Sequence, residues 1–130
     1  MTHPNNDLLQ RYYEAFQRGD LDTMAACFHH DVAFHEPGRH PLSGTHEGPS
    51  AVIDLFKALV ERTGGTLRLD QIGALVANAD TGAAKIHLTA RSAEGPVAIE
   101  ALELYTFRDG LISDIRAYLH DQYEWDALLS

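Results

Sequence analysis

The chain has 130 residues, of which 45% are hydrophobic and 22% charged, and it carries a formal net charge of −9. This length can bury one sizeable core but not two, so we predict a single domain spanning residues 1–130. The ten basic residues are scattered and are outnumbered by 19 acidic ones, which argues against binding to a nucleic-acid backbone.

Neither a membrane span nor a secretion signal is evident. The longest apolar run is too short to cross a bilayer, and the opening segment MTHPNNDLLQ lacks the basic and apolar blocks of a signal peptide. The single cysteine, Cys27, cannot form an internal disulfide. We therefore expect a soluble protein of the cytoplasm.

Three amphipathic helices are predicted in the first half of the chain. Residues 7–18 place leucine and aromatic side chains on one stripe, and Gly19 follows as a stop. A shorter helix over residues 21–28 is capped by Asp20. The third helix begins at Pro49, which suits the first helical position, and its apolar residues recur at helical spacing until a TGG sequence.

Extended segments make up the rest of the chain. A short strand over residues 32–36 precedes a loop over residues 37–49 that contains three prolines and three glycines. Four longer strands follow, joined by the turn sequences NADTG, AEG and RDG, and they span residues 66–77, 83–92, 96–107 and 111–119. The tail DQYEWDALLS is expected to form a terminal helical turn.

This order of elements predicts an α+β fold. A curved antiparallel sheet packs against three N-terminal helices, because strands of this length usually curl and need one face covered. Such an arrangement encloses a pocket between sheet and helices, which is the usual location of a small-molecule site.

The alternation of side chains along strand 96–107 singles out Glu103. One face of this strand carries, in order, Val97, Ile99, Ala101, Glu103, Tyr105 and Phe107. A carboxylate in an apolar row is costly to bury, which favours a protonated, proton-donating group in the pocket or a firm partner. The alternative is an ion pair with a basic residue at an interface.

The strand over residues 32–36 delivers either Glu36 or His35 to the pocket. Val32, Phe34 and Glu36 share one face, and His35 lies on the other. If Val32 and Phe34 face the core, Glu36 reaches the pocket rim just before a Pro-Gly break. A shift of one residue would send His35 inward instead.

Tyr12 and Asp121 are further polar groups with two interpretations each. Tyr12 lies on the apolar stripe of the first helix, where it is either a donor in the pocket or a structural tyrosine hydrogen-bonded to a backbone group. Asp121 continues the alternation of inward-facing residues on the last strand and could face the pocket as an acid/base group. Alternatively, it caps a helix in the tail.

Three stretches carry a resemblance to known proteins: QRYYEAFQRGDLDTMAACFHHDVAFHEPG, SGTHEGPSAVIDLF and LELYTFRDGLISDIRAYLHD. They resemble the nuclear-transport-factor-2-like superfamily, and within it the ketosteroid isomerases and the SnoaL-like polyketide cyclases. The resemblance extends from about Leu8 to Tyr123 and implies a cone-shaped, cystatin-like fold. It also implies a homodimer formed through the outer face of the sheet, where Leu102, Leu104 and Tyr118 would lie.

The resemblance also implies roles for individual residues. On the isomerase pattern, Tyr12 falls at the tyrosine that donates to the substrate oxygen, Glu36 at the general base, and Glu103 at the protonated carboxylate of the oxyanion hole. Glutamate replaces the family's aspartate at both carboxylate positions. On the cyclase pattern, Asp121 falls near an acid/base aspartate, and Glu103 takes the place of a histidine.

The resulting hypothesis is a cofactor-independent enzyme that performs isomerisation, dehydration or cyclisation of an apolar carbonyl compound by acid/base chemistry. The predicted catalytic residues are Glu36 with His35 as its substitute, Tyr12, Glu103 and Asp121. The predicted pocket is lined by Phe16, Phe34, Phe56, Tyr105, Phe107, Ile115 and Leu119.

Two alternatives stay open: a binding or accessory protein without catalysis, and an enzyme that adds water to an epoxide. The sequence lacks a cofactor fingerprint, and its eight histidines lack metal-site spacings such as H-E-x-x-H. We therefore expect no cofactor and no metal. The expected partners are a small apolar substrate and a second copy of the chain, without nucleic acid or membrane.

Overall fold

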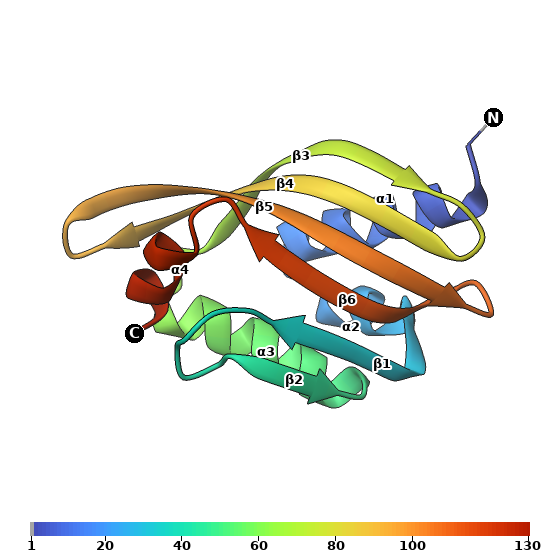
Figure 1. Ribbon diagram of the computed structural model, residues 1–130, viewed down its shortest axis with the longest axis horizontal. Coiled ribbons are helices and arrows are strands. Elements are labelled where there is room, and N and C mark those ends of the chain that lie inside the picture. Colours follow the sequence, from blue (N-terminus) through green and yellow to red (C-terminus); the bar gives the residue numbers. More distant parts are fainter. Residues whose placement is uncertain (1) are drawn as a thin grey trace.

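The computed structural model describes residues 2–130 and contains a six-stranded sheet and four helices (Figure 1). In chain order the elements are α1 (Pro4–Arg18), α2 (Leu21–Ala26), β1 (Phe28–Glu36), β2 (Gly44–Glu47), α3 (Pro49–Arg62), β3 (Arg68–Ala77), β4 (Thr81–Ser92), β5 (Gly95–Arg108), β6 (Leu111–Leu119) and α4 (Gln122–Leu129). None of these helices is long and apolar enough to span a membrane.

The strand order in the sheet is β2-β1-β6-β5-β4-β3. The predicted meander is confirmed, because β3, β4, β5 and β6 pair antiparallel in sequence order. β1 adds to the free edge of β6 in parallel, and β2 pairs antiparallel with β1. A parallel pair cannot be joined by a hairpin, so this contact depends on the helices and strands that lie between β1 and β6.

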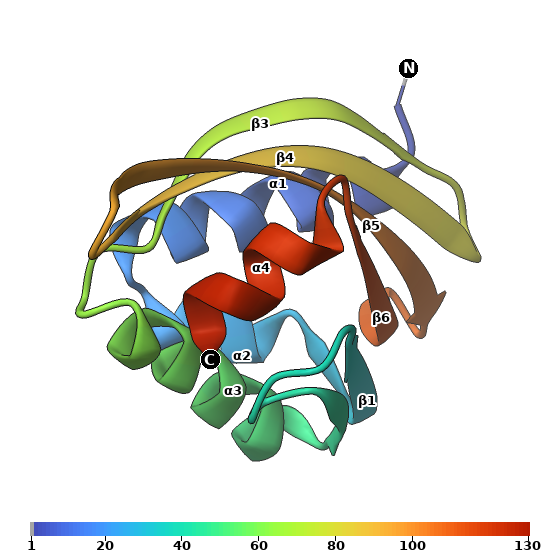
Figure 2. The ribbon, with the colours of Figure 1, turned by 60° about the vertical axis from the view of Figure 1, so that its left-hand side comes forward.

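The sheet is curved, and the helices lie on its concave side. Register shifts between β3 and β4, after Leu69 and after Ile72, are irregularities of the kind that increase local twist. Figure 2 shows the sheet arching over α1, with α4 lying between the arch and α3. The α+β, cystatin-like fold expected from the sequence is therefore confirmed.

Several element boundaries differ from the sequence-based predictions. α2 ends at Ala26, two residues early, and β1 begins at Phe28, four residues before the predicted strand. The predicted loop contains β2, because the prolines and glycines bound a four-residue hairpin arm that pairs with β1. The predicted terminal turn is a helix of eight residues, α4, whose buried Trp125 and Leu129 anchor it against the core.

The alternation in β5 is as predicted. Ile99, Ala101, Glu103, Tyr105 and Phe107 are buried, and the residues between them are half-buried or exposed. The carboxyl group of Glu103 is therefore held on the concave side of the sheet by the period-two geometry of the strand.

Candidate active site

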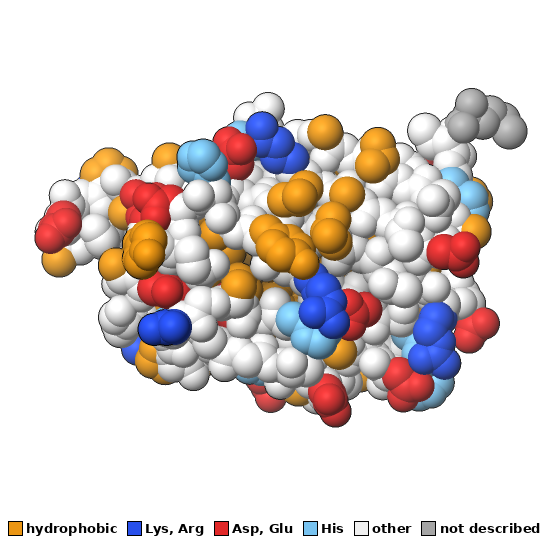
Figure 3. All heavy atoms as spheres, in the orientation of Figure 1, with side chains coloured by type: hydrophobic (Ala, Val, Ile, Leu, Met, Phe, Trp, Pro, Cys, Tyr) orange, Lys and Arg blue, Asp and Glu red, His pale blue; other side chains and the backbone are white. Residues whose placement is uncertain are grey.

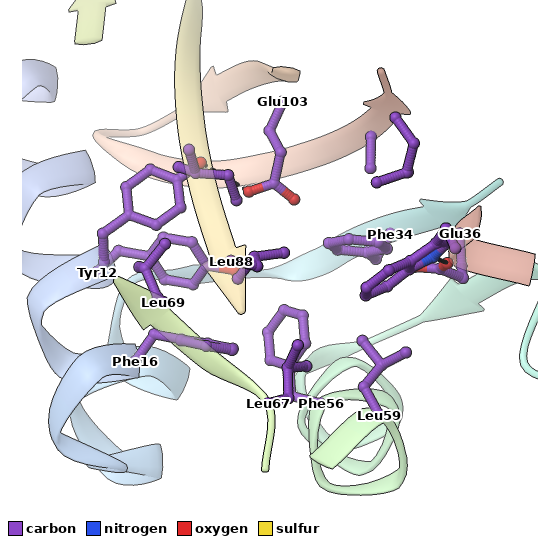
Figure 4. Close-up of a pocket in the computed structure, with 15 residues that line it drawn as sticks. Tyr12, Phe16, Phe34, Glu36, Phe56, Leu59, Leu67, Leu69, Leu88 and Glu103 are labelled. Carbon is purple, nitrogen blue, oxygen red and sulfur yellow. Dashed lines mark hydrogen bonds between the residues drawn. The ribbon is translucent and has the colours of Figure 1, made fainter. Parts of the chain in front are cut away.

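A cavity of about 50 Å³ lies between the concave face of the sheet and helices α1, α3 and α4 (Figure 4). Its wall is apolar except for a few groups, and within residues 2–130 its only charged side chains are Glu36 and Glu103. This volume has room for a few water molecules or for the reacting end of a ligand.

Glu36 is the last residue of β1 and is 5% exposed. Its Oε2 accepts two hydrogen bonds, from Nε1 of Trp125 at 2.7 Å and from Nε2 of His40 at 2.9 Å. Its Oε1 has no hydrogen-bond partner in residues 2–130. These residues contain no fully buried side-chain oxygen without a partner, so Oε1 is not fully enclosed, and Glu36 is one of the residues that line the cavity. One oxygen thus fixes the carboxylate, and the other has no hydrogen-bond partner within residues 2–130.

His40 contacts Glu36 as a neutral donor. The Nδ1 atom of His40 accepts a hydrogen bond from the backbone N–H of Leu42 at 3.1 Å, so the neutral ring carries its proton on Nε2. Burial lowers the pKa of His40, which keeps the ring uncharged. His40 therefore orients the carboxylate of Glu36 without neutralising it.

Burial raises the pKa of Glu36 to about 7. The indole N–H of Trp125 and the nearby His46 act in the opposite direction, and the negative charge of Asp126 adds to the increase. A carboxyl group with a pKa close to neutrality accepts a proton more readily than an ordinary glutamate while still being ionised in part at pH 7.

Glu103 faces the same cavity from β5 and is 7% exposed. Its Oε1 lies 2.7 Å from the hydroxyl oxygen of Tyr13 and 3.2 Å from that of Tyr105, and these two hydroxyls are also within hydrogen-bond reach of each other, so their two protons are shared among three contacts. Its Oε2 has no partner in residues 2–130 and is not fully enclosed, by the same reasoning as for Glu36. Figure 4 shows its carboxyl group pointing into the cavity.

Burial also raises the pKa of Glu103 to about 7, and the charge of Glu36 adds to this increase, while the hydroxyls of Tyr13 and Tyr105 oppose it. Since the two carboxyl groups repel each other when both are charged, the state with one proton between them is favoured near neutrality.

Tyr12 completes the polar part of the cavity. It is 2% exposed and lines the cavity, and its hydroxyl has no hydrogen-bond partner in residues 2–130. Burial raises the pKa of Tyr12 well above its usual value. The hydroxyl therefore remains protonated and is a free donor.

His35 and Asp121 lie away from the cavity. His35 points to the outer face, where Nε2 contacts Oδ1 of Asp114 at 2.8 Å and Nδ1 contacts Oγ1 of Thr45 at 3.0 Å. Asp121 is exposed and caps α4, accepting a hydrogen bond from the backbone N–H of Glu124 at 3.1 Å. Of the alternatives left open by the sequence, the structure thus places Glu36 inward and Asp121 at a helix start.

The predicted pocket residues divide into two groups. Four of them line the cavity, namely Phe16, Phe34, Phe56 and Leu119. Tyr105 does not line it but bonds to Glu103 from behind. Phe107 and Ile115 are buried outside the cavity lining, because β5 and β6 continue beyond the cavity toward the turn that joins them.

Sequence reasoning missed three polar contacts of the carboxyl groups. His40 lies in the predicted loop, Trp125 lies in the predicted terminal turn, and Tyr13 follows Tyr12 on the first predicted helix. Only the pairing of Glu36 with His40 left a local signal, since the two residues are four apart across a Pro-Gly turn. The contact between Trp125 and Glu36 spans 89 residues and depends on where α4 packs.

One further group of potential metal ligands lies outside the cavity. Ligand-type atoms of His29, His30 and Asp31 lie within 4.8 Å of one another. However, Nδ1 of His29 accepts the backbone N–H of Asp31 at 3.1 Å, so its Nε2 carries the proton of the neutral ring. A metal ion at Nε2 would require the ring proton to move to Nδ1, which would break the hydrogen bond from the N–H of Asp31. We therefore assign no metal to this group.

The position of α4 can be tested at Gly38, which has a φ of 94° and lies against this helix. A Cβ at Gly38 would overlap Oδ1 of Asp126 and Nε2 of Gln122, which bond to each other at 2.9 Å. We expect Gly38→Ala to lower the free energy of unfolding by about 2 kcal/mol, measured by chemical denaturation.

Gly44→Ala is the matched control, because Gly44 also has a positive φ but its Cβ would meet no atom within 4 Å. It should cost only the backbone strain, about 1 kcal/mol. Equal losses in the two variants would show that Gly38 does not position α4.

Comparisons with known proteins agree with this architecture. A crystal structure from Xanthomonas campestris, described as a protein of unknown function with a cystatin-like fold, has a TM-score of 0.89 and 27% identity, covering 100% of this chain and 99% of that chain. A candidate polyketide cyclase from Xanthomonas campestris pv. campestris has a TM-score of 0.72 and 26% identity, covering 98% and 97%.

Two further comparisons concern sequence. An uncharacterised protein of Mycobacterium tuberculosis is 36% identical over 61 residues, which are 47% of each chain, so the match spans about half the length of the curated relatives. The SnoaL-like domain family matches residues 9–115, which include Tyr12, Glu36 and Glu103. Because this match covers most of the 130 residues, the chain belongs to the SnoaL-like domain family.

Proposed function

We propose that this protein is a cofactor-independent enzyme that moves a proton next to the carbonyl group of an apolar compound, leading to isomerisation, dehydration or ring closure. The observation that carries the proposal is the pair of carboxyl groups in one apolar cavity, each held by one oxygen while the other has no hydrogen-bond partner within residues 2–130. Membership in the SnoaL-like family and the likeness to a candidate polyketide cyclase support a function of the cyclase or isomerase type.

In this proposal Oε1 of Glu36 removes a proton from the carbon next to the carbonyl group. Negative charge then develops on the carbonyl oxygen, which accepts hydrogen bonds from the hydroxyl of Tyr12 and from the protonated carboxyl of Glu103. Glu36 returns the proton to another atom, or the enolate attacks an electrophile within the same molecule. The apolar wall excludes water and strengthens both hydrogen bonds.

The proton is assigned to Glu103 and not to Glu36 because their donors differ. Glu36 accepts hydrogen bonds from two N–H groups, which can donate a hydrogen bond but cannot accept one. They therefore favour the ionised form of Glu36. Glu103 bonds only to hydroxyls, which can serve as donors or acceptors and so accommodate either protonation state. A charged Glu36 also raises the pKa of Glu103.

Deuterium exchange tests this step without knowledge of the natural substrate. β-Tetralone is a compact apolar ketone with acidic protons next to its carbonyl group, and their exchange in D₂O is read by NMR. Exchange catalysed by the protein supports the proposal. Saturable binding without exchange, for a set of such ketones, would favour a binding protein instead. Incorporation of labelled solvent oxygen into an epoxide would favour water addition.

The exchange rate is expected to follow a narrow bell-shaped curve with pH. The ascending limb follows loss of the proton from Glu36, and the descending limb follows loss of the proton from Glu103, both with pKa values of about 7. Catalysed exchange measured from about pH 5 to pH 9 should peak near neutrality and decline on both sides. A rate that continues to rise up to pH 9 would contradict the role of protonated Glu103.

The homodimer expected from the family resemblance is also a proposal. Leu102 and Tyr118 are direct partners across β5 and β6 and are 43% and 51% exposed. Leu104 is a further exposed apolar residue on the same outer face. In Figure 3 hydrophobic side chains gather near the middle of this face.

Light scattering of the purified protein should give twice the mass of the chain, and Leu104→Glu should shift it to a monomer, because a buried unpaired charge is costly. A wild-type monomer at high concentration would exclude this proposal. Tyr123→Glu is the control, because Tyr123 is an apolar residue that is 89% exposed on α4, away from the outer face of the sheet, so this change should leave the mass unaltered.

A further inference from the structure

A second, larger hollow adjoins the cavity. It lies between the end of α1, α3 and the start of β3, has a volume of about 520 Å³, and opens to solvent. We call it the mouth groove. Phe16, Phe56, Leu67 and Leu69 line both the mouth groove and the cavity. These four apolar side chains therefore form the wall between the two spaces, and a ligand would pass from one to the other by displacing them.

The mouth groove differs in charge from the molecule as a whole. It is lined by three basic residues, Arg18, Lys57 and Arg68, and by one acidic residue, Glu61. Asp20, next to the lining, pairs with Arg18 at 3.3 Å. Even with Asp20 included, positive groups outnumber negative ones here, in a chain whose formal net charge is −9. Such a local excess attracts an anion against the general field of the protein.

Lys57 and Arg68 have N–H groups that can still donate hydrogen bonds to an anion. Lys57 is exposed and has no acidic partner within 4 Å in residues 2–130. Arg68 donates from Nη1 to the carbonyl oxygens of Gly65 and Leu67 at 2.8 and 2.9 Å, which leaves its other N–H groups available. Neither Lys57 nor Arg68 forms an ion pair within residues 2–130, and the one carboxylate in the groove lining, Glu61, is balanced by the three basic residues there.

The mouth groove and the reactive carboxylate lie on different sides of the cavity. In Figure 4 Phe16 is on the side away from Glu36, Leu67 lies below the middle of the cavity beside Phe56, and Glu103 points in from the sheet. A ligand that enters through the mouth groove would bring its leading end to Glu36 and keep its trailing end among the basic residues. The inner cavity of about 50 Å³ accommodates only the leading end, whereas about 520 Å³ is available to the rest.

We infer that the substrate of this site is a ketone whose apolar body ends in a carboxylate, and that Lys57 and Arg68 bind this carboxylate in the mouth groove. The inference rests on the proposed function for the orientation of the ketone. It adds a substrate class, an amphiphilic keto acid, and it assigns specificity to residues that take no part in proton transfer.

The test uses matched ligands that differ only in charge. ω-Acetyl fatty acids of increasing chain length carry a methyl ketone at one end and a carboxylate at the other, and their primary amides are neutral. Calorimetric titration at low salt should show each acid of suitable length binding about fivefold to tenfold tighter than its amide. Because exposed charges are screened by ions, about 0.5 M NaCl should remove most of this preference.

Lys57→Ala and Arg68→Gln should each reduce the preference, and together abolish it, while the affinity for the amide stays the same. Glutamine keeps an N–H donor for the carbonyls that Arg68 contacts. Lys85→Ala is the control, because Lys85 is an exposed cation on β4 that pairs with Glu100, outside the groove. It should leave the preference unchanged.

Failure of this inference can be told apart from failure of the proposed function. If acid and amide bind equally, or if the double variant keeps the preference, the mouth groove does not bind carboxylates, whatever the exchange experiment shows. If the preference is present and depends on Lys57 and Arg68 but no ketone undergoes exchange, the substrate class holds as a ligand class and the catalytic proposal fails.

Discussion

Replacing Glu36 with glutamine is expected to lower the catalysed rate of proton exchange by roughly 100-fold to 10,000-fold. Glutamine has nearly the same shape, and its amide oxygen can accept the hydrogen bonds from Trp125 and His40 that now reach Oε2. It cannot accept a proton at neutral pH, however. The loss should therefore appear in kcat with little change in KM, because the substrate meets the same apolar wall.

Asp121→Asn is the control for this experiment. Asn is an equally good cap for α4, and Asp121 is exposed and outside the cavity. This variant should retain the wild-type exchange rate. His35→Gln tests the other residue that the sequence placed near the base, and it should also retain activity because His35 bonds on the outer face. If either variant loses as much activity as Glu36→Gln, the base has been misassigned.

Replacing Glu103 with glutamine is expected to stabilise the protein at alkaline pH. The pKa of Glu103 is raised from 4.5 in the unfolded chain to about 7 in the folded protein, so the folded state holds its proton more tightly. This tighter proton binding stabilises the folded protein. The stabilisation is fully present below pH 4.5 and is lost as the pH rises through about 7. For Glu103 the loss is about 3 kcal/mol, and Glu36 contributes in the same direction.

The measurement is the free energy of unfolding by denaturant at a series of pH values. Wild type should lose stability from about pH 5 to pH 8, and Glu103→Gln should lose less and be the more stable of the two at pH 8. Glu100→Gln is the matched control on the opposite face of β5. The pKa of Glu100 is lowered by its contact with Lys85, so this change should not stabilise the protein at pH 8. A Glu103→Gln variant with the same pH dependence as wild type would show that Glu103 is ionised in the folded state at neutral pH.

The placement of Glu103 could be predicted because it follows from geometry within one strand. The alternation of β5 extends over many residues and pairs on both sides with antiparallel neighbours, so its inward face is determined by the apolar residues alone. Glu36 was harder to place, because the alternation of residues 32–36 is short and one of the two strands that pair with them, β6, is 81 residues away in the sequence. Both registers were compatible with the local pattern.

Other features of the site depend on contacts that no local pattern encodes. His40 lies in a segment rich in proline and glycine, and only the turn after Glu36 returns its ring to the carboxylate. For Asp121 two local patterns made different predictions. The alternation of β6 predicts a side chain that faces the pocket, and the start of α4 predicts a helix cap. The helix start prevailed, because the side chain satisfies the N–H of Glu124, which would otherwise lack a partner in the first turn.

The hydrogen bond between Trp125 and Glu36 has a practical consequence. Trp125 is the only tryptophan of the chain, and its indole N–H is 2.7 Å from the oxygen of the proposed base. Tryptophan emission is sensitive to a negative charge at the indole ring, so the intrinsic fluorescence of the protein is a spectroscopic readout of the charge on Glu36. A fluorescence titration would give the ionisation of this single carboxyl group directly, and a shift in its midpoint would identify ligands before any product is known.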